Sequence, residues 1–187
     1  MRAVMQQEFG GPEVLKVADV PAPTPLPSEV VVAVHAAGLN PVEGVIRSGA
    51  FPLLGQPPFV LGWDLSGVIS EVVPGVNRFQ VGDEVYGMPL FPRPAGTYAE
   101  LVAAPSRQLA RKPRSSDHVH AAALPLAGLT AWQSLVDIAA VEPGQVAGAW
   151  RWRRRWPSRC ADRQAPGRPR RRDGKRRKAR LRAGAWR

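Results

Sequence analysis

The stretch that decides the fold is LGWDLSGVISEVVPGVNRFQVGDEVYGM, residues 61–88. Residues 64–73 alternate small, apolar and polar side chains and are rich in Val and Ile, which predicts a half-buried β-strand. Pro74-Gly75 ends that strand, and residues 81–83 form a second turn before a short strand at 84–86. Glycines recur where a barrel must bend or let two backbones approach closely. The pattern alone predicts a small β-barrel.

The residues before this stretch supply further strands and one helix start. Residues 2–6, 15–17 and 30–35 each predict a strand, because they are short and rich in apolar residues. Asn40, followed by Pro41 and then Glu43, has the form of a helix N-terminus: Asn caps, Pro occupies the first turn and Glu reaches back.

The residues after the stretch predict one more strand and two helices. Residues 96–102 have the composition of a short strand. Residues 117–124 predict a helix with Ser115 or Ser116 as its cap. Residues 126–140 carry apolar side chains at helical spacing and predict a second helix.

Charge divides the chain into a body, residues 1–145, and a basic tail, residues 146–187. The body holds nine basic and thirteen acidic residues, a net charge of −4. The basic tail holds seventeen basic and two acidic residues, a net charge of +15, together with four of the six Trp. High charge with little aliphatic periodicity predicts a tail that is disordered on its own.

Composition also bounds the setting of the protein. The single Cys160 excludes an internal disulfide and suits a reducing compartment. The first fifteen residues lack the pattern of a secretory signal. No apolar run reaches the roughly 20 residues of a membrane-spanning helix. We therefore expect a soluble, cytoplasmic protein with no membrane partner.

The order of residues is more specific than their pattern. G-W-D-x-S-G-x-I-x-E-V, followed by P-G-V-x-x-F-x-V-G-D-E-V-Y-G, resembles the core of the medium-chain dehydrogenase/reductase superfamily, and within it the zinc-independent, NADPH-dependent quinone oxidoreductase branch. The resemblance covers the body. It implies a mainly β fold with short helices: a GroES-like, partly open β-barrel at 1–125, then a linking helix and the start of the cofactor domain at 126–145.

The resemblance also implies functions for particular residues. Asn40 and Pro41 would form the loop that faces the nicotinamide, where zinc-dependent relatives carry a catalytic Cys. Thr130 matches a Thr near the nicotinamide, the alternative being a Thr that only packs the helix. A substrate pocket would be lined by Val45, Phe51, Trp63 and Phe91. Core packing is the other interpretation of Trp63, and Val45 stands where relatives often carry Tyr. No catalytic acid or base is assigned.

A zinc site is not expected. The second ligand in zinc dehydrogenases would be a His in a G-H-E segment, and here that segment is Gly62-Trp63-Asp64. Four cysteines for a structural zinc site are also missing. His118 and His120 are two positions apart at a predicted helix start, so they do not share a helix face. We expect these histidines to have surface or capping roles.

The resemblance stops after Gln145. A relative would continue with V-L-V-H-G-A-G-G-V-G, the loop that places pyrophosphate on a helix N-terminus. Here the text is VAGAWRWRRRW, residues 146–156. Codons compatible with residues 146–155, read from the second base of each, can encode L-L-V-H-G-A-G-G-V-G, and two later tail segments also yield family-like strings. We hypothesise a one-frame shift shortly after Gln145, which would make the basic tail a remnant of a Rossmann domain.

The sequence thus predicts a truncated NADPH-dependent oxidoreductase that transfers hydride to a quinone or an α,β-unsaturated carbonyl, with weak or no activity as written. The parent family would form homodimers through cofactor-domain strands, and that surface would be lost here. Two alternatives stay open. One is a non-catalytic GroES-like binding module. The other is nucleic-acid binding through the basic tail, whose cations would neutralise phosphates and whose Trp side chains could stack on bases.

Overall fold

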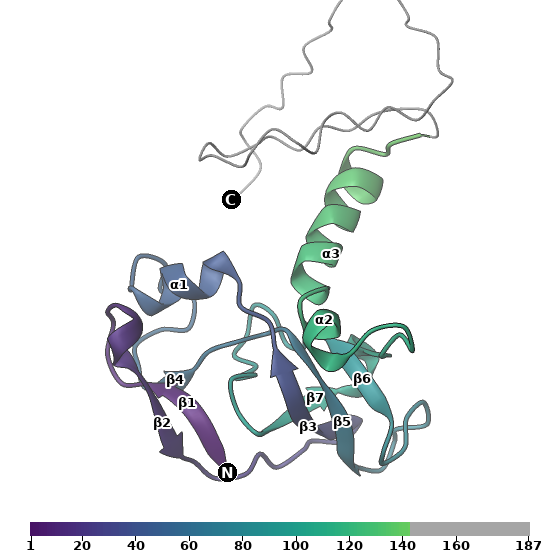
Figure 1. Cartoon of the computed structure of the whole chain (residues 1–187), viewed down its shortest axis with the longest axis horizontal. Coiled ribbons are helices and arrows are strands. Elements are labelled where there is room, and N and C mark those ends of the chain that lie inside the picture. Colours follow the sequence, from purple (N-terminus) through teal and green to yellow (C-terminus); the bar gives the residue numbers. More distant parts are fainter. Residues whose placement is uncertain (143–187) are drawn as a thin grey trace, which may run out of the picture. The chain divides into compact units, whose positions relative to one another are not determined.

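The structure is a computed structural model that describes residues 1–142 (Figure 1). It holds two antiparallel sheets. The smaller sheet has the order β2-β1-β4, formed by β1 (Arg2–Gln6), β2 (Leu15–Asp19) and β4 (Phe59–Val60). The larger sheet has the order β7-β3-β5-β6-β8, formed by β3 (Glu29–Ala37), β5 (Leu65–Val72), β6 (Glu84–Gly87), β7 (Leu101–Pro105) and β8 (Leu109–Arg111).

The two sheets curl into a half-barrel that is joined along one side. The Val4 amide donates to the Tyr98 carbonyl at 2.8 Å, and the Val34 amide donates to the Glu100 carbonyl at 2.9 Å. The segment before β7 therefore hydrogen-bonds to β1 on one side and to β3 on the other. The predicted mainly β fold with short helices and a partly open barrel is confirmed.

Two apolar clusters form the core. The first fills the larger sheet and consists of Val30, Val32, Leu65, Ile69, Phe79, Val85, Val102, Ala104 and Leu109. Their alternation along β3 and β5 is the period-2 pattern expected of strands with one buried face. The second cluster is smaller and joins α1 (Pro41–Arg47) to the residues before β5 through Ile46, Leu61 and Trp63.

Gly67 lies in β5 and pairs with Val34 of β3. A side-chain carbon there would press against the Ala33 carbonyl of β3. The backbone is extended, so the requirement for glycine comes from close packing between neighbouring strands.

The helices lie at the end of the barrel that carries the ends of β3 and β6 (Figure 1). α2 (His118–Ala122) packs on β3, β5 and β6. α3 (Pro125–Trp132) follows and continues into a π-helical stretch, η3 (Gln133–Ile138). Two short 3₁₀ turns, η1 (Pro12–Val14) and η2 (Ser106–Gln108), complete the elements. Within residues 1–142 no helix combines the length and apolar character needed to cross a bilayer.

Two local predictions are corrected. The strand expected at 96–102 begins only at Leu101, because Thr97 and Tyr98 donate to the Gly62 and Leu61 carbonyls in place of a regular strand ladder, and Gly96 has φ +67°. The cap of α2 is Asp117, which accepts from the His120 amide at 2.8 Å, in place of Ser115 or Ser116. The predicted helix at 126–140 is present as α3 and η3. The predictions for the basic tail lie outside the described residues.

Candidate functional site

Asn40 stands at the N-terminus of α1, as the sequence predicts. Its backbone amide donates to Oε2 of Glu43 at 2.6 Å, the reach-back half of a capping box. Glu43 is buried, and the same Oε2 atom accepts from the Tyr98 hydroxyl at 2.7 Å. Burial first, and then the bond to the Glu43 carboxylate, raises the pKa of Tyr98. Tyr98 therefore stays a hydrogen-bond donor that holds the start of α1.

The side chain of Asn40 is held by a second carboxylate. Its Nδ2 donates to Oδ2 of Asp64 at 3.1 Å. Asp64 is fully buried, and burial raises the pKa of its carboxyl group. The bonds from Asn40 and from the Leu126 amide lower that pKa, and the nearby Glu43 raises it. Residue spacing did not indicate this contact, because Asp64 is remote from Asn40 in the sequence.

Pro41 and Thr130, the other predicted cofactor residues, are both exposed. Pro41 occupies the first position of α1, and Thr130 lies in α3, one turn after Leu126. The structure thus places each of them on a helix whose N-terminus is bonded to Asp64. Their contact with a nicotinamide stays a prediction.

The four residues predicted to line a substrate pocket divide into two kinds. Trp63 is fully buried, packs in the second core cluster and donates its Nε1 hydrogen to the Arg93 carbonyl at 2.8 Å. Phe91 meets it edge-on, with 5.4 Å between ring centroids, and is itself 44% exposed. Val45 and Phe51 are also about half exposed, near the end of α1 and in the following loop. The structure brings together only Trp63 and Phe91.

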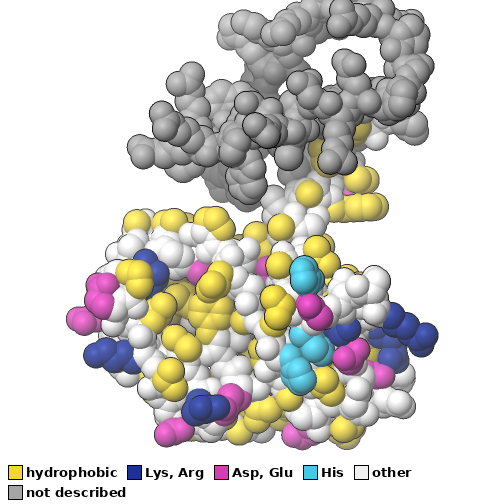
Figure 2. All heavy atoms as spheres, viewed as in Figure 1, with side chains coloured by type: hydrophobic (Ala, Val, Ile, Leu, Met, Phe, Trp, Pro, Cys, Tyr) yellow, Lys and Arg dark blue, Asp and Glu magenta, His cyan; other side chains and the backbone are white. Residues whose placement is uncertain are grey.

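A cavity of about 580 Å³ lies between α3 and the larger sheet. Sequence reasoning missed it, although the exposed apolar positions of the linking helix were a signal. Figure 2 shows hydrophobic side chains along α3 and on the neighbouring edge of the barrel. The cavity is lined by Tyr86, Gly87, Met88, Arg107, Gln108, Leu109, Ala110, Leu124, Pro125, Gly128, Leu129 and Trp132.

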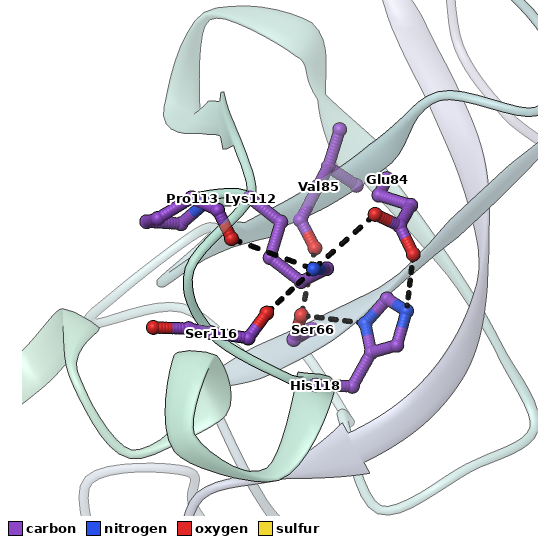
Figure 3. Close-up of polar contacts among 7 residues, drawn as sticks. All are labelled: Ser66, Glu84, Val85, Lys112, Pro113, Ser116 and His118. Carbon is purple, nitrogen blue, oxygen red and sulfur yellow. Dashed lines mark hydrogen bonds and ion pairs between the residues drawn. The ribbon is translucent and has the colours of Figure 1, made fainter.

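A second polar cluster joins α2 to the larger sheet (Figure 3). His118 Nδ1 lies 2.8 Å from Ser66 Oγ, and its Nε2 lies 3.3 Å from Glu84 Oε1. The other oxygen of Glu84 is 3.2 Å from Lys112 Nζ, which also donates to the Ser116 carbonyl at 2.6 Å. The bond from Lys112 is the main reason why the pKa of Glu84 is lowered.

This cluster has the residue types of a Ser-His-carboxylate triad, but a substrate cannot reach its serine. Ser66 is fully buried, and its hydroxyl also lies 3.0 Å from the Val85 carbonyl, to which it can donate. A nucleophile must be reachable by its substrate. The cluster therefore anchors α2 to β5 and β6. The expectation of surface or capping roles for the histidines holds for His120, which bonds to Asp117 at 2.7 Å, and is wrong for His118, whose side chain is 16% exposed.

Metal-ligating residues do not gather in the described part of the chain. Residues 1–142 contain no group of three His, Cys, Asp or Glu side chains placed to hold one ion. Asp64 and Glu43, the buried carboxylates, bond to Asn40, Tyr98 and Leu126.

Comparison with known proteins gives one matching family model and a set of similar oxidoreductases. Residues 26–114 match the model of the alcohol dehydrogenase GroES-like domain. Human quinone oxidoreductase is 38% identical over 146 residues, which are 78% of this chain and 44% of that protein. The chain therefore spans less than half the length of the curated relatives it matches.

Solved structures of quinone oxidoreductases are similar to this chain as well. The quinone oxidoreductase of Coxiella burnetii is 38% identical, with a TM-score of 0.71 over 77% of this chain and 46% of that one. Escherichia coli quinone oxidoreductase, solved in complex with NADPH, is 28% identical, with a TM-score of 0.66 over 74% of this chain and 41% of that one. Over the part that these relatives match, the chain is similar to the quinone oxidoreductases of the medium-chain dehydrogenase/reductase superfamily, and residues 26–114 match an alcohol dehydrogenase GroES-like domain.

Proposed function

We propose that residues 1–142 form the nicotinamide- and substrate-side half of an NADPH-dependent reductase that acts on a quinone or an α,β-unsaturated carbonyl. The observation that carries this proposal is Asn40, a half-buried residue at the N-terminus of α1, whose side-chain amide bonds to the buried Asp64 and whose backbone amide bonds to the buried Glu43. The similarity to quinone oxidoreductases supports the same reaction class.

In this proposal Asn40 and Thr130 would offer polar groups to the nicotinamide end of NADPH, and Pro41 would offer an apolar surface. NADPH, when bound, supplies the hydride, and the protein supplies orientation. Because Trp63 stands where zinc-dependent relatives carry a His ligand, we assign polarisation of the substrate carbonyl to hydrogen bonds from side chains, backbone or water.

The exposed side chains of Val45, Phe51 and Phe91 suit the flat apolar face of a quinone. Their partial exposure leaves apolar area that a ring can cover, and covering such area favours binding. Trp63, by contrast, would act by supporting Phe91 from within the core.

Binding of the phosphates of NADPH is a separate matter. The sequence contains no Gly-x-Gly, the start of the dinucleotide-binding fingerprint. We therefore propose that the chain as written binds NADPH poorly and turns over slowly.

The test uses the full chain with two hydride donors: NADPH, and dihydronicotinamide riboside, which carries no phosphate. The quinone chosen reacts slowly with either donor in the absence of protein. We expect the chain to accelerate oxidation of both donors, with little advantage for NADPH and loss of the acceleration in Asn40→Ala. No acceleration with either donor would contradict the proposed reaction. NADPH turnover close to that of Escherichia coli quinone oxidoreductase would contradict the proposed weakness.

A further inference from the structure

Asp64 connects three parts of the chain. Its backbone carbonyl accepts from the Gly38 amide at 3.1 Å, just beyond the end of β3. Its Oδ2 accepts from the Asn40 side chain at 3.1 Å. The Leu126 amide donates to Oδ1 at 3.1 Å and to Oδ2 at 3.3 Å. One fully buried residue therefore contacts the end of β3, the N-terminus of α1 and the N-terminus of α3.

α3 depends on this contact because its own sequence offers no cap. The residue at the capping position is Leu124, which has an apolar side chain and helical backbone angles and makes no side-chain capping bond. The first amides of a helix need an acceptor from outside the helix, and negative charge is favoured there. Asp64 supplies both from a remote position in the sequence.

The packing around Asp64 leaves little room for other arrangements. A side-chain carbon added at Gly38 would lie 2.8 Å from Asp64 Cβ and 2.6 Å from the Ala122 carbonyl at the end of α2. Glycine therefore lets the turn after β3 pass between Asp64 and α2. The Asp64 carboxylate is therefore held at both helix N-termini by its hydrogen bonds and by the close packing of the Gly38 backbone against it.

A carboxylate suits this position in a way that a neutral amide does not. Asp64 accepts from two donors, the Asn40 amide nitrogen and the Leu126 backbone amide. An Asn in its place has one oxygen, so if that oxygen faces Leu126 its NH₂ group faces the NH₂ group of Asn40. A buried charge is costly unless its partners are in place, and here both partners are present.

We propose that Asp64 is a positioning residue that couples the Asn40 side chain to the N-terminus of α3. Thr130 follows Leu126 by one turn. The same carboxylate therefore fixes the positions of both predicted nicotinamide contacts relative to each other. The relevance of this coupling to catalysis rests on the proposed function, whereas the coupling itself is a property of the fold and is tested without cofactor.

The experiment follows amide resonances of the full chain by ¹⁵N NMR. In the wild type, the Asn40 side-chain amide and the Leu126 backbone amide should titrate with one shared midpoint, that of Asp64. In Asp64→Asn both titrations should vanish, and hydrogen exchange at Leu126 should become about tenfold faster or more through loss of a charge-assisted bond. Asp117→Asn is the matched control, because Asp117 caps α2 locally, and it should leave Leu126 unchanged.

A reciprocal exchange separates coupling from general destabilisation. In the double variant Asn40→Asp with Asp64→Asn, the amide now at position 64 can donate to the carboxylate now at position 40 while its oxygen accepts from Leu126. We expect this variant to restore protection at Leu126, and to restore folding if Asp64→Asn alone does not fold. Normal protection in Asp64→Asn, or no rescue by the double variant, would overturn the proposal.

The coupling and the proposed function can fail separately. If the shared titration and the rescue are observed but dihydronicotinamide riboside does not perturb Asn40 or Thr130, the coupling stands and the proposed function fails. If the riboside perturbs both residues but Leu126 does not respond to Asp64→Asn, the reverse holds.

Discussion

The imidazole rings of His35 and His118 lie 4.5 Å apart between centroids, at an interplanar angle of 40°. His35 lies near the end of the strand β3 and His118 begins α2, so the pair joins two elements that are far apart in the sequence. Glu84 and Lys112 face the same His118 ring from β6 and the segment after β8. Figure 2 shows histidine side chains gathered beside acidic ones below α3.

This arrangement predicts a pH dependence of stability. Burial first, and then the charge of His35, lowers the pKa of His118 below its usual 6.5, while Glu84 opposes the change. Below pH 6.5 the unfolded chain therefore binds a proton that the folded chain binds less readily. The contribution of neutral His118 to the free energy of unfolding should be present in full above about pH 6.5 and should be lost as the pH falls below that value.

Urea unfolding at about pH 7.5 and about pH 5.5 checks this prediction. Several carboxylates also titrate in the acid range, so the informative quantity is the difference between variants. His118→Asn should lose less stability than the wild type between the two pH values. His120→Asn, at an exposed site, should behave like the wild type. Equal losses in the wild type and His118→Asn would contradict the assignment.

Two glycines form a matched pair for testing the fold. Gly67 faces the Ala33 carbonyl across the sheet, whereas a side-chain carbon at Gly44 in α1 would meet open space. Gly67→Ala should lower the free energy of unfolding by about 1–3 kcal/mol or more through overpacking. Gly44→Ala should raise it by about 0.5–1 kcal/mol, because Ala favours the helix and restricts the unfolded chain. Effects of the same sign in denaturant unfolding would show that the strand contact is misplaced.

The fold could be predicted where local signals and tertiary structure agree. Alternation over residues 64–73 gives β5, and the Asn40-Pro41-Glu43 spacing gives the start of α1. The strand at 96–102 was misplaced because the residues before Leu101 bond to the Leu61-Gly62 segment, to β1 and to β3 in turn, and such bonding to distant residues leaves no mark on local composition. The α2 cap was misassigned by one or two residues among several polar candidates.

Only part of the candidate site could be predicted from the sequence. Asn40 could be proposed because its position matches a family motif and a helix cap at once. The role of Asp64 could not, since its partners lie in α1 and at the start of α3. The one local hint was Leu124, a residue that cannot cap the helix that follows it. Ser66, Glu84 and His118 likewise meet only through the topology of β5, β6 and α2.

The basic tail should bind single-stranded RNA without sequence preference. Seventeen cations with interleaved Trp can neutralise phosphates and stack on bases. In a plot of log affinity against log salt, the slope should be about −0.7 for each phosphate neutralised. Fluorescence anisotropy across a salt series measures this slope, and deletion of residues 146–187 should abolish binding. Affinity that survives the deletion, or that ignores salt, would contradict binding by the tail.

The frame-shift hypothesis predicts a specific result from the gene. Sequencing genomic DNA and transcript across the codons for residues 144–152 should reveal one base inserted or lost relative to the frame that encodes V-H-G-A-G-G-V-G. Correction of that base would yield a chain with a Rossmann domain after the linking helix. If the codons for residues 146–155, read from their second base, do not encode this glycine-rich loop, the hypothesis is wrong.

We propose that Asn40 and Thr130 face a nicotinamide ring, and a titration of the ¹⁵N-labelled full chain with dihydronicotinamide riboside tests this placement directly. Because the riboside lacks phosphate, attraction to the basic tail does not obscure the result. We expect saturable shifts at the Asn40 side-chain amide and the Thr130 backbone amide, and none with adenosine as control. Unmoved resonances at both residues, or equal shifts with adenosine, would contradict it.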